Sequence, residues 1–489
     1  MMFCSVVTVF TACCSGADEL DLAGKWRVRI DEADEGLVRK WFANPLQGGL
    51  TAALPGSLAQ SGLGHEYNPE SGRFDGLPNP PYLKWPSRGF TEKNRRDELG
   101  HLVPSHMTYG PAWYERDIVI PADWGDRDIR LSLERVKWSS MVWIDGQPIA
   151  AKVDDSLHTP HIYDLGRLAP GSHRITIRID NSPHLNIGIA GHGYGMETEP
   201  LWNGVAGAVR LQTLDPVEVS TFSTMPSADW QSVEARFSFD PLPATDLDFI
   251  ARLVDPDSGR LLGEGSARIE DGEADLSLNI PLEGEVQPWD EFDPKLYRLE
   301  WTISDSGGVI ESGADLTGLR LVQKKGKRIF LNGKPIFLRG NIDCAIHPGS
   351  HTPPADREWW ERMLGIHKKA GFNHIRFHTW CPPGIAFDVA DELGLYLQVE
   401  TTYWVDDWIH SIDPHPPAIG QNEQVDEWIM LESSRIIETY KHHPSFVMFS
   451  IGNELGVSSS DWNKINEIIG ELKSLDRNIL LSSQNRRRT

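Results

Sequence analysis

The stretch His-Pro-Ser-Phe-Val-Met-Phe-Ser-Ile-Gly-Asn-Glu, residues 443–454, is the strongest indication of fold class in the second half of the chain. Within it, Phe446–Ile451 is a short and almost continuous apolar run, without alternation of apolar and polar positions. A strand of this kind is buried on both faces, which is typical of a parallel sheet covered by helices. Asn453 and Glu454 follow the run and are therefore expected at the carboxyl end of the strand.

Strands and helices alternate on both sides of this run. The sequence predicts further strands at 336–342, 374–378, 396–400 and 479–482. Predicted helices separate them: one capped by Asp356 and stopped at Gly371, one ending at Gly394, and two more at 425–440 and 461–475. This order predicts either a doubly wound sheet or a (β/α)8 barrel. A complete barrel takes about 250 residues, so about five strands after Arg328 predict an incomplete TIM barrel.

The first part of the chain shows a different period. Ile129, Leu131 and Leu133 alternate with polar residues, and so do Ile175, Ile177 and Ile179. This period of two puts one row of side chains into a core and the other into water. Asp145-Gly146 adds a hairpin signal. Many short strands at this spacing predict a jelly-roll β-sandwich.

A second all-β segment follows. Val233, Ala235, Phe237 and Phe239 share one face of a predicted strand, and about a hundred residues with Gly, Pro and Asp between strands fit an immunoglobulin-like β-sandwich. The expected organisation is a signal peptide at 1–17, a jelly roll at 18–215, an immunoglobulin-like sandwich at 216–320 and the first part of a TIM barrel at 321–489.

The N-terminal segment predicts export. Met1–Cys14 is apolar and small, and Ser15-Gly16-Ala17 resembles a cleavage site. Fourteen apolar residues are too few to span a bilayer. Phe10–Cys13 also resembles a lipobox, so the sequence leaves open whether the protein is released to the periplasm or the exterior, or anchored through a lipidated Cys13. Beyond this segment only Cys344 and Cys381 remain; two unpaired thiols are favoured over a single bridge.

The composition limits the classes of partner. Seventy acidic and 47 basic residues give a formal charge of −23, which disfavours binding to nucleic acid or to an anionic membrane. The 18 tryptophans point first to large sandwich cores and second to stacking on carbohydrate. No CxxC or HExxH spacing indicates a metal site, although the sequence leaves open whether a divalent cation assists. Oligomeric state is also left open.

Polar and aromatic residues gather at the predicted strand ends. In a parallel barrel these ends form the open face that carries active sites. Carboxylates, an amide, a guanidinium and indoles suit the hydroxyls and the apolar face of a sugar. The candidates are Asp343, Arg376, His378, Trp380, Glu400, Trp404, Asn453 and Glu454.

The run 443–454 resembles the acid/base signature of glycoside hydrolase family 2, which includes β-galactosidases and β-glucuronidases. Tyr109–Tyr114, Trp289 with Pro294–Tyr297, and the hairpin Leu331–Pro335 support the resemblance. It implies a jelly roll, an immunoglobulin-like domain and a barrel in this order, and a retaining exo-β-glycosidase acting on a β-linked carbohydrate.

The resemblance also implies roles for individual residues. Glu454 would be the acid/base, with a pKa raised by the apolar strand before it. Asn453 would bond the sugar 2-hydroxyl, and Arg376 would hold the nucleophile ionised. The sequence departs from the family pattern around the subsite that recognises the sugar; for example, a single residue separates Arg376 from His378. The sequence therefore leaves open which sugar is cleaved. For the other candidates the sequence allows either role: contact with the substrate, or structural support of neighbouring residues.

A retaining glycosidase needs two carboxyl groups about 5–5.5 Å apart. In the family the nucleophile ends the seventh strand, but the glutamates after Glu454 are Glu467 and Glu471, both in the predicted helix 461–475. We therefore expect the nucleophile to be absent, in a fragment, a frameshifted product or a chain completed by a separate one. The alternative is a non-catalytic carbohydrate-binding protein.

Overall fold

The computed structural model describes residues 18–70, 73–77, 103–149, 153–188, 190–194, 201–404, 416–455 and 460–483. Leu214–Leu321 belongs to one compact unit, and Glu19–Thr213 with Val322–Thr489 forms the other. The segment 1–17, including Cys13, lies outside the described residues, so export and lipid anchoring stay predictions. Within the described ranges, no helix is long and apolar enough to cross a membrane.

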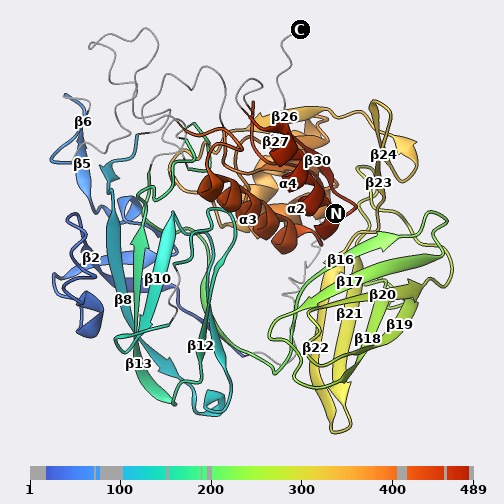
Figure 1. Cartoon of the computed structure of the whole chain (residues 1–489), viewed down its shortest axis with the longest axis horizontal. Coiled ribbons are helices and arrows are strands. Elements are labelled where there is room, and N and C mark those ends of the chain that lie inside the picture. The colour runs from blue at the N-terminus through green and yellow to red at the C-terminus, as the bar shows by residue number, and fades with distance from the viewer. Residues whose placement is uncertain are drawn as a thin grey trace, which may run out of the picture. The chain divides into compact units, whose positions relative to one another are not determined.

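Residues 19–213 form two main antiparallel sheets around one core (Figure 1, blue to green). The six-stranded sheet has the order β11 (Gln147–Pro148), β10 (Ser139–Ile144), β13 (Gly171–Asp180), β8 (Pro111–Ile120), β2 (Gly24–Ile30), β3 (Leu50–Leu54). The four-stranded sheet has the order β1 (Glu19–Asp21), β15 (Val209–Thr213), β9 (Ile129–Leu133), β12 (His161–Gly166). Smaller elements are β4 (Gly56–Ser57) with β14 (Gly204–Val205), β5 (His65–Asn68), β6 (Arg73–Phe74), β7 (His106–Met107), and the 3₁₀ helices η1 (Trp41–Ala43), η2 (Ala59–Ser61) and η5 (Ala122–Trp124).

The apolar residues that alternate with polar ones in the sequence are buried, as predicted. Ile129, Leu131 and Leu133 lie fully buried on β9. The three isoleucines of β13, at positions 175, 177 and 179, are buried in the same core. Asp145 and Gly146 join β10 to β11 with φ values of 51° and 80°, as a type I′ hairpin requires.

The unit Leu214–Leu321 is also all-β, and the range predicted from the sequence, 216–320, lies within it. Phe237, Phe249, Leu299 and Trp301 meet in its core. The two sheets have the orders β16 (Val219–Pro226), β17 (Ser232–Phe239), β20 (Asp275–Pro281), and β19 (Leu261–Ile269), β18 (Leu247–Val254), β21 (Tyr297–Asp305), β22 (Gly308–Thr317).

The third segment begins with a small sheet and continues as a parallel α/β sheet. The small sheet is β23 (Val322–Lys325), β24 (Arg328–Leu331) and β25 (Lys334–Pro335), with Asn332-Gly333 as the turn. The parallel strands are β26 (Gly340–Asp343), β27 (His374–Phe377), β28 (Tyr396–Glu400), β29 (Phe446–Ser450) and β30 (Leu480–Ser482). The helices are α1 (Arg357–Lys369), α2 (Gly384–Leu393), α3 (Glu423–Tyr440) and α4 (Trp462–Leu475).

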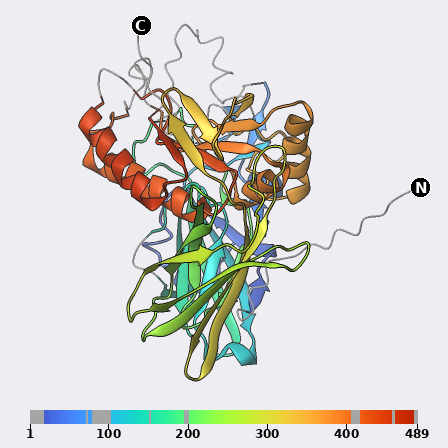
Figure 2. The ribbon, with the colours of Figure 1, turned by 90° about the vertical axis from the view of Figure 1, so that its right-hand side faces the viewer.

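The predicted strand–helix alternation is thus confirmed for the described residues. The five strands are neighbours in chain order. This order is that of a barrel, because a doubly wound sheet reverses its strand order at a switch point. Figure 2 shows the red helix α3 on one flank of the strands and orange helices on the other.

The first and third segments are predicted as separate domains but share one compact unit. Glu432 of α3, fully buried, accepts hydrogen bonds from His158 Nδ1 (2.8 Å) and the Leu157 backbone N–H (2.9 Å). Arg435 on the same helix donates to Asp155 at 3.0 Å. Buried polar contacts of this kind join the two segments and cannot be recognised from local sequence patterns.

Cys344 and Cys381 form no disulfide in the structure. The prediction favoured from the sequence, that no bridge joins these two cysteines, is confirmed. Cys381 is fully buried, and this burial raises the pKa of its thiol. Cys344 is only half-buried and lies directly after β26.

Candidate active site

The carboxyl ends of the parallel strands bring most of the candidate residues to one edge of the sheet. Asp343 ends β26, Glu400 ends β28, and Asn453 and Glu454 follow β29. His378 follows β27 directly, and its backbone N–H donates to the Asp343 carbonyl at 2.8 Å. This edge is where a parallel barrel places its chemistry.

Arg376 is the centre of a hydrogen-bonded network at this edge. Its Nε donates to Glu400 Oε1 at 2.6 Å, and its Nη2 donates to Asn453 Oδ1 at 2.7 Å. Glu400 Oε2 also accepts from the Thr379 backbone N–H at 2.9 Å. The carboxyl of Glu400 is fully buried, which raises its pKa, while Arg376 opposes this effect. Glu400 therefore holds the guanidinium of Arg376 in position, and its own buried carboxyl is not exposed to a ligand.

Glu454 sits on a backbone bend after β29. Its φ is 44°, a left-handed conformation that is uncommon outside glycine and often found at functional sites. Gly452 precedes it with a φ of 147°, and a Cβ there would lie 2.4 Å from the Tyr403 carbonyl oxygen. The Asn453 N–H donates to that same oxygen at 2.9 Å. Trp404 Nε1 donates to Glu454 Oε2 at 3.2 Å, so the indole orients the carboxyl.

His378 lies against Trp404 and against a residue that the sequence analysis missed. Its ring centroid is 4.9 Å from Trp404 and 4.8 Å from His192, which belongs to the segment before β14. Burial, together with the charge of Arg376, lowers the pKa of His378 to about 4. The ring is therefore neutral near pH 7 and able to donate and accept hydrogen bonds.

His192 reaches the strand edge from the first all-β segment. Its backbone N–H donates to Thr379 Oγ1 at 2.7 Å, and its side chain is buried. The only local signal in the sequence is its position between Gly191 and Gly193, which permits close approach to the barrel segment. Without the tertiary structure, nothing relates that signal to residues near 379.

Asp343 is half-buried, and Trp380 is buried more deeply than the sequence suggests. Burial raises the pKa of Asp343 to about 6, and its Oδ1 accepts from the Ala345 backbone N–H at 2.9 Å. Trp380 is 1% exposed and packs against Trp360 and Phe377. Its ring belongs to the hydrophobic core and exposes no face, so the predicted substrate contact does not apply to Trp380.

The barrel segment matches a known protein family. Residues 322–487 match the family described as glycosyl hydrolases family 2, TIM barrel domain. This segment is thus similar to the barrel domain of that family. Relatives of the chain include a β-galactosidase of Priestia megaterium, 23% identical over 70% of this chain and 33% of the relative. A putative β-glucuronidase of Formosa agariphila is 25% identical over 76% of this chain and 44% of the relative.

Solved structures are similar to this chain in fold. The crystal structure of Ruminococcus gnavus β-glucuronidase superposes with a TM-score of 0.71 at 17% identity, covering 96% of this chain and 72% of that one. The chain spans about a third to somewhat less than half of the curated relatives it matches.

The glutamates that follow Glu454 in the described residues lie away from the strand edge. Glu467 and Glu471 are both exposed on α4, and Glu467 accepts from Lys464 Nζ at 2.9 Å. This is the placement that the sequence analysis predicts. At the described strand ends, the carboxyls other than Glu454 are those of Asp343 and Glu400.

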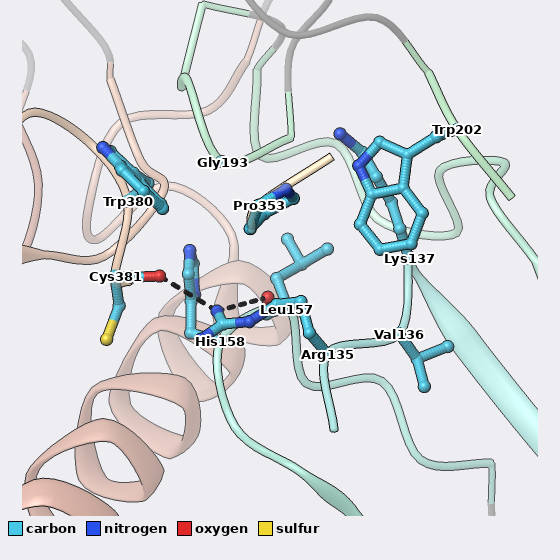
Figure 3. A pocket seen from close by; sticks show the side chains of 10 residues that line it. All are labelled: Arg135, Val136, Lys137, Leu157, His158, Gly193, Trp202, Pro353, Trp380 and Cys381. Carbon is cyan, nitrogen blue, oxygen red and sulfur yellow. Dashed lines mark hydrogen bonds between the residues drawn. The ribbon is translucent and has the colours of Figure 1, made fainter. Parts of the chain in front are cut away.

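A small internal cavity lies behind Trp380 and is distinct from the strand edge (Figure 3). Arg135 beside it donates from Nη1 to the Cys381 carbonyl at 3.0 Å and to the Leu157 carbonyl at 3.2 Å. The cavity volume is about 10 Å³, which is room for about one water molecule. It is far too small for a sugar, and its lining residues come from both the first segment and the barrel segment.

Proposed function

We propose that the chain carries the acid/base half of a retaining exo-β-glycosidase, with Glu454 as the proton donor. The observation that supports this most is the strand-edge arrangement of Glu454 beside Trp404, with Asn453 bonded to Arg376. The match of residues 322–487 to the TIM barrel domain of glycosyl hydrolases family 2 supports the same reaction class. Relatives named β-galactosidase and β-glucuronidase favour a β-galactoside or a β-glucuronide as substrate.

In the proposed reaction Glu454 acts twice. It first protonates the glycosidic oxygen as the bond to the anomeric carbon breaks and a second carboxylate bonds that carbon. It then removes a proton from water, which displaces the carboxylate and releases the sugar with retained configuration. General acid catalysis of this kind contributes about 10²–10⁴-fold to the rate.

Asn453 would orient the sugar. Its Oδ1 accepts from Arg376, which fixes the orientation of the amide. The NH2 group is then the part of Asn453 that would donate to the sugar 2-hydroxyl, a contact that strengthens in the transition state. Arg376 is already paired with Glu400 at 2.6 Å, so its first role is to hold this amide.

The nucleophile would come from residues outside this 489-residue chain. We assign the five parallel strands to the first part of an eight-stranded barrel, and the two all-β segments to a jelly roll and an immunoglobulin-like sandwich. In this assignment a later strand, from a continuation of the chain or from a second chain, supplies the second carboxyl.

The test compares the 489-residue chain with one extended by its downstream coding sequence. Both are assayed on 4-nitrophenyl β-D-galactoside and β-D-glucuronide. We expect no turnover by the shorter chain and turnover by the longer one, reduced about 10²–10⁴-fold by Glu454→Gln. Glu467→Gln, exposed on α4, is the matched control and leaves the rate unchanged.

Two outcomes would contradict parts of this proposal. Turnover by the 489-residue chain that Glu454→Gln abolishes would place the second carboxyl within these residues. Sugar binding without hydrolysis in both chains, insensitive to Glu454→Ala, would favour a carbohydrate-binding protein instead.

A further inference from the structure

Three side chains from three separate segments converge beside the candidate proton donor. The ligand atoms of His192, Cys344 and His378 all lie within 4.8 Å of one another. We propose that these three residues bind a borderline-soft divalent cation, with Zn²⁺ as the preferred ion. This inference does not depend on the proposed glycosidase activity.

Backbone hydrogen bonds hold the three ligands at one place. Cys344 follows Asp343 at the end of β26, and the His378 N–H donates to the Asp343 carbonyl at 2.8 Å. The His192 N–H donates to Thr379 Oγ1 at 2.7 Å, and the N–H of the next residue, a glycine, donates to the Thr379 carbonyl at 3.0 Å. The segment carrying His192 is therefore tied to the residue next to His378.

Close packing fixes that segment further. A Cβ on Gly191 would lie 2.5 Å from Thr402 Oγ1, and one on Gly193 would lie 2.7 Å from His158 Nε2. Both positions therefore require glycine in this packing. The two glycines let the chain approach closely enough for the His192 ring to reach the sheet edge. This packing holds the backbone that carries His192 in place at the sheet edge.

The donor set selects the ion. Two imidazole nitrogens and one thiolate are ligands that Zn²⁺ prefers, with bond lengths of about 2.0–2.1 Å to nitrogen and about 2.3 Å to sulfur. A set of three protein ligands leaves a fourth position for water, as in catalytic zinc sites. The nearby charge of Arg376 would oppose a cation, but Glu400 at 2.6 Å offsets it.

The position of the site relates it to the candidate proton donor. The His378 ring lies edge-on to Trp404 at a centroid distance of 4.9 Å, and Trp404 donates to Glu454. An ion held by His378 would therefore lie on the same strand edge as Glu454. Its open position would bind a water molecule or a sugar hydroxyl.

The test uses Co²⁺ as a spectroscopic substitute for Zn²⁺ on the purified 489-residue chain, after removal of metals by a chelator. We expect one Co²⁺ per chain, with the intense visible bands of a tetrahedral site and an ultraviolet thiolate-to-cobalt charge-transfer band. Cys344→Ser abolishes the charge-transfer band. His192→Gln and His378→Gln each weaken binding by more than the about 10–100-fold typical of outer-shell changes.

Cys381→Ser is the matched control, because Cys381 is the other cysteine of the described residues and is fully buried. It keeps the charge-transfer band. A second measurement needs no variant: Zn²⁺ should protect Cys344 of the unaltered chain from alkylation, and a chelator should reverse the protection. Absence of cobalt binding, a band that survives Cys344→Ser, or alkylation of Cys344 unaffected by Zn²⁺ would overturn the proposal.

Discussion

His347 illustrates how burial alone sets the chemistry of a single side chain. It is 1% exposed and lies between Trp359 and Trp380, with ring centroids 5.7 and 5.3 Å away. Within the described residues neither ring nitrogen has a hydrogen-bond partner. Burial, and secondarily the charge of Lys137, lowers the pKa of His347 to about 3. The folded protein therefore keeps this ring neutral well below pH 6.5.

We predict a pH-dependent contribution of His347 to stability. The unfolded chain protonates this ring below pH 6.5 and the folded chain only near pH 3, so the contribution is present above pH 6.5 and is lost as pH falls. Between pH 7.5 and 5, the His347→Leu variant should lose about 2 kcal/mol less free energy of unfolding than the unaltered chain. Urea unfolding at the two pH values measures this; equal losses in both proteins would contradict it.

At the scale of the element, local rules place most helix and turn boundaries. Asp356 is predicted as the cap of a helix, and its side chain accepts from the Glu358 backbone N–H at 3.1 Å at the start of α1. Gly394 ends α2 with a φ of 69°. These positions are predictable because capping and left-handed turns depend on a few neighbouring residues.

The cap of α1 gives a prediction at this scale. Asp356→Ala should cost about 1 kcal/mol of stability, because it leaves a backbone N–H of the first turn without its partner. Arg362→Ala, exposed in the middle of the same helix, is the control and should change stability by less than about 0.5 kcal/mol. Urea unfolding followed by tryptophan fluorescence compares the two; equal effects would show that the cap contributes nothing specific.

At the scale of the whole molecule, Glu432 joins the first all-β segment to the barrel segment. Burial would raise the pKa of Glu432, but the hydrogen bond from His158 and the charge of Arg435 lower it instead. Burial lowers the pKa of His158 despite this contact. The pair is therefore a neutral imidazole donating to a buried carboxylate, and this carboxylate depends on partners from the other segment.

Removal of this contact should destabilise the unit formed by Glu19–Thr213 and Val322–Thr489. We expect Glu432→Gln to cost about 3 kcal/mol, and a double-mutant cycle with His158→Phe to show a coupling of about 1–3 kcal/mol. Glu438→Gln, which removes a more exposed carboxylate on the same helix, should cost less than about 1 kcal/mol. Additive effects of Glu432→Gln and His158→Phe in thermal unfolding would contradict direct coupling.

Local sequence is enough to predict the elements and the edge at which the candidate site lies. The apolar run on both faces predicts the buried strand Phe446–Ser450. Because Glu454 comes shortly after this strand in the sequence, its place at the carboxyl end of the sheet is predicted as well. The folded chain was needed to establish that His192 meets His378, that Trp380 is buried, and that the first and third segments form one unit. These features depend on packing between residues far apart in the chain, whereas strand periods, caps and turns depend on neighbours.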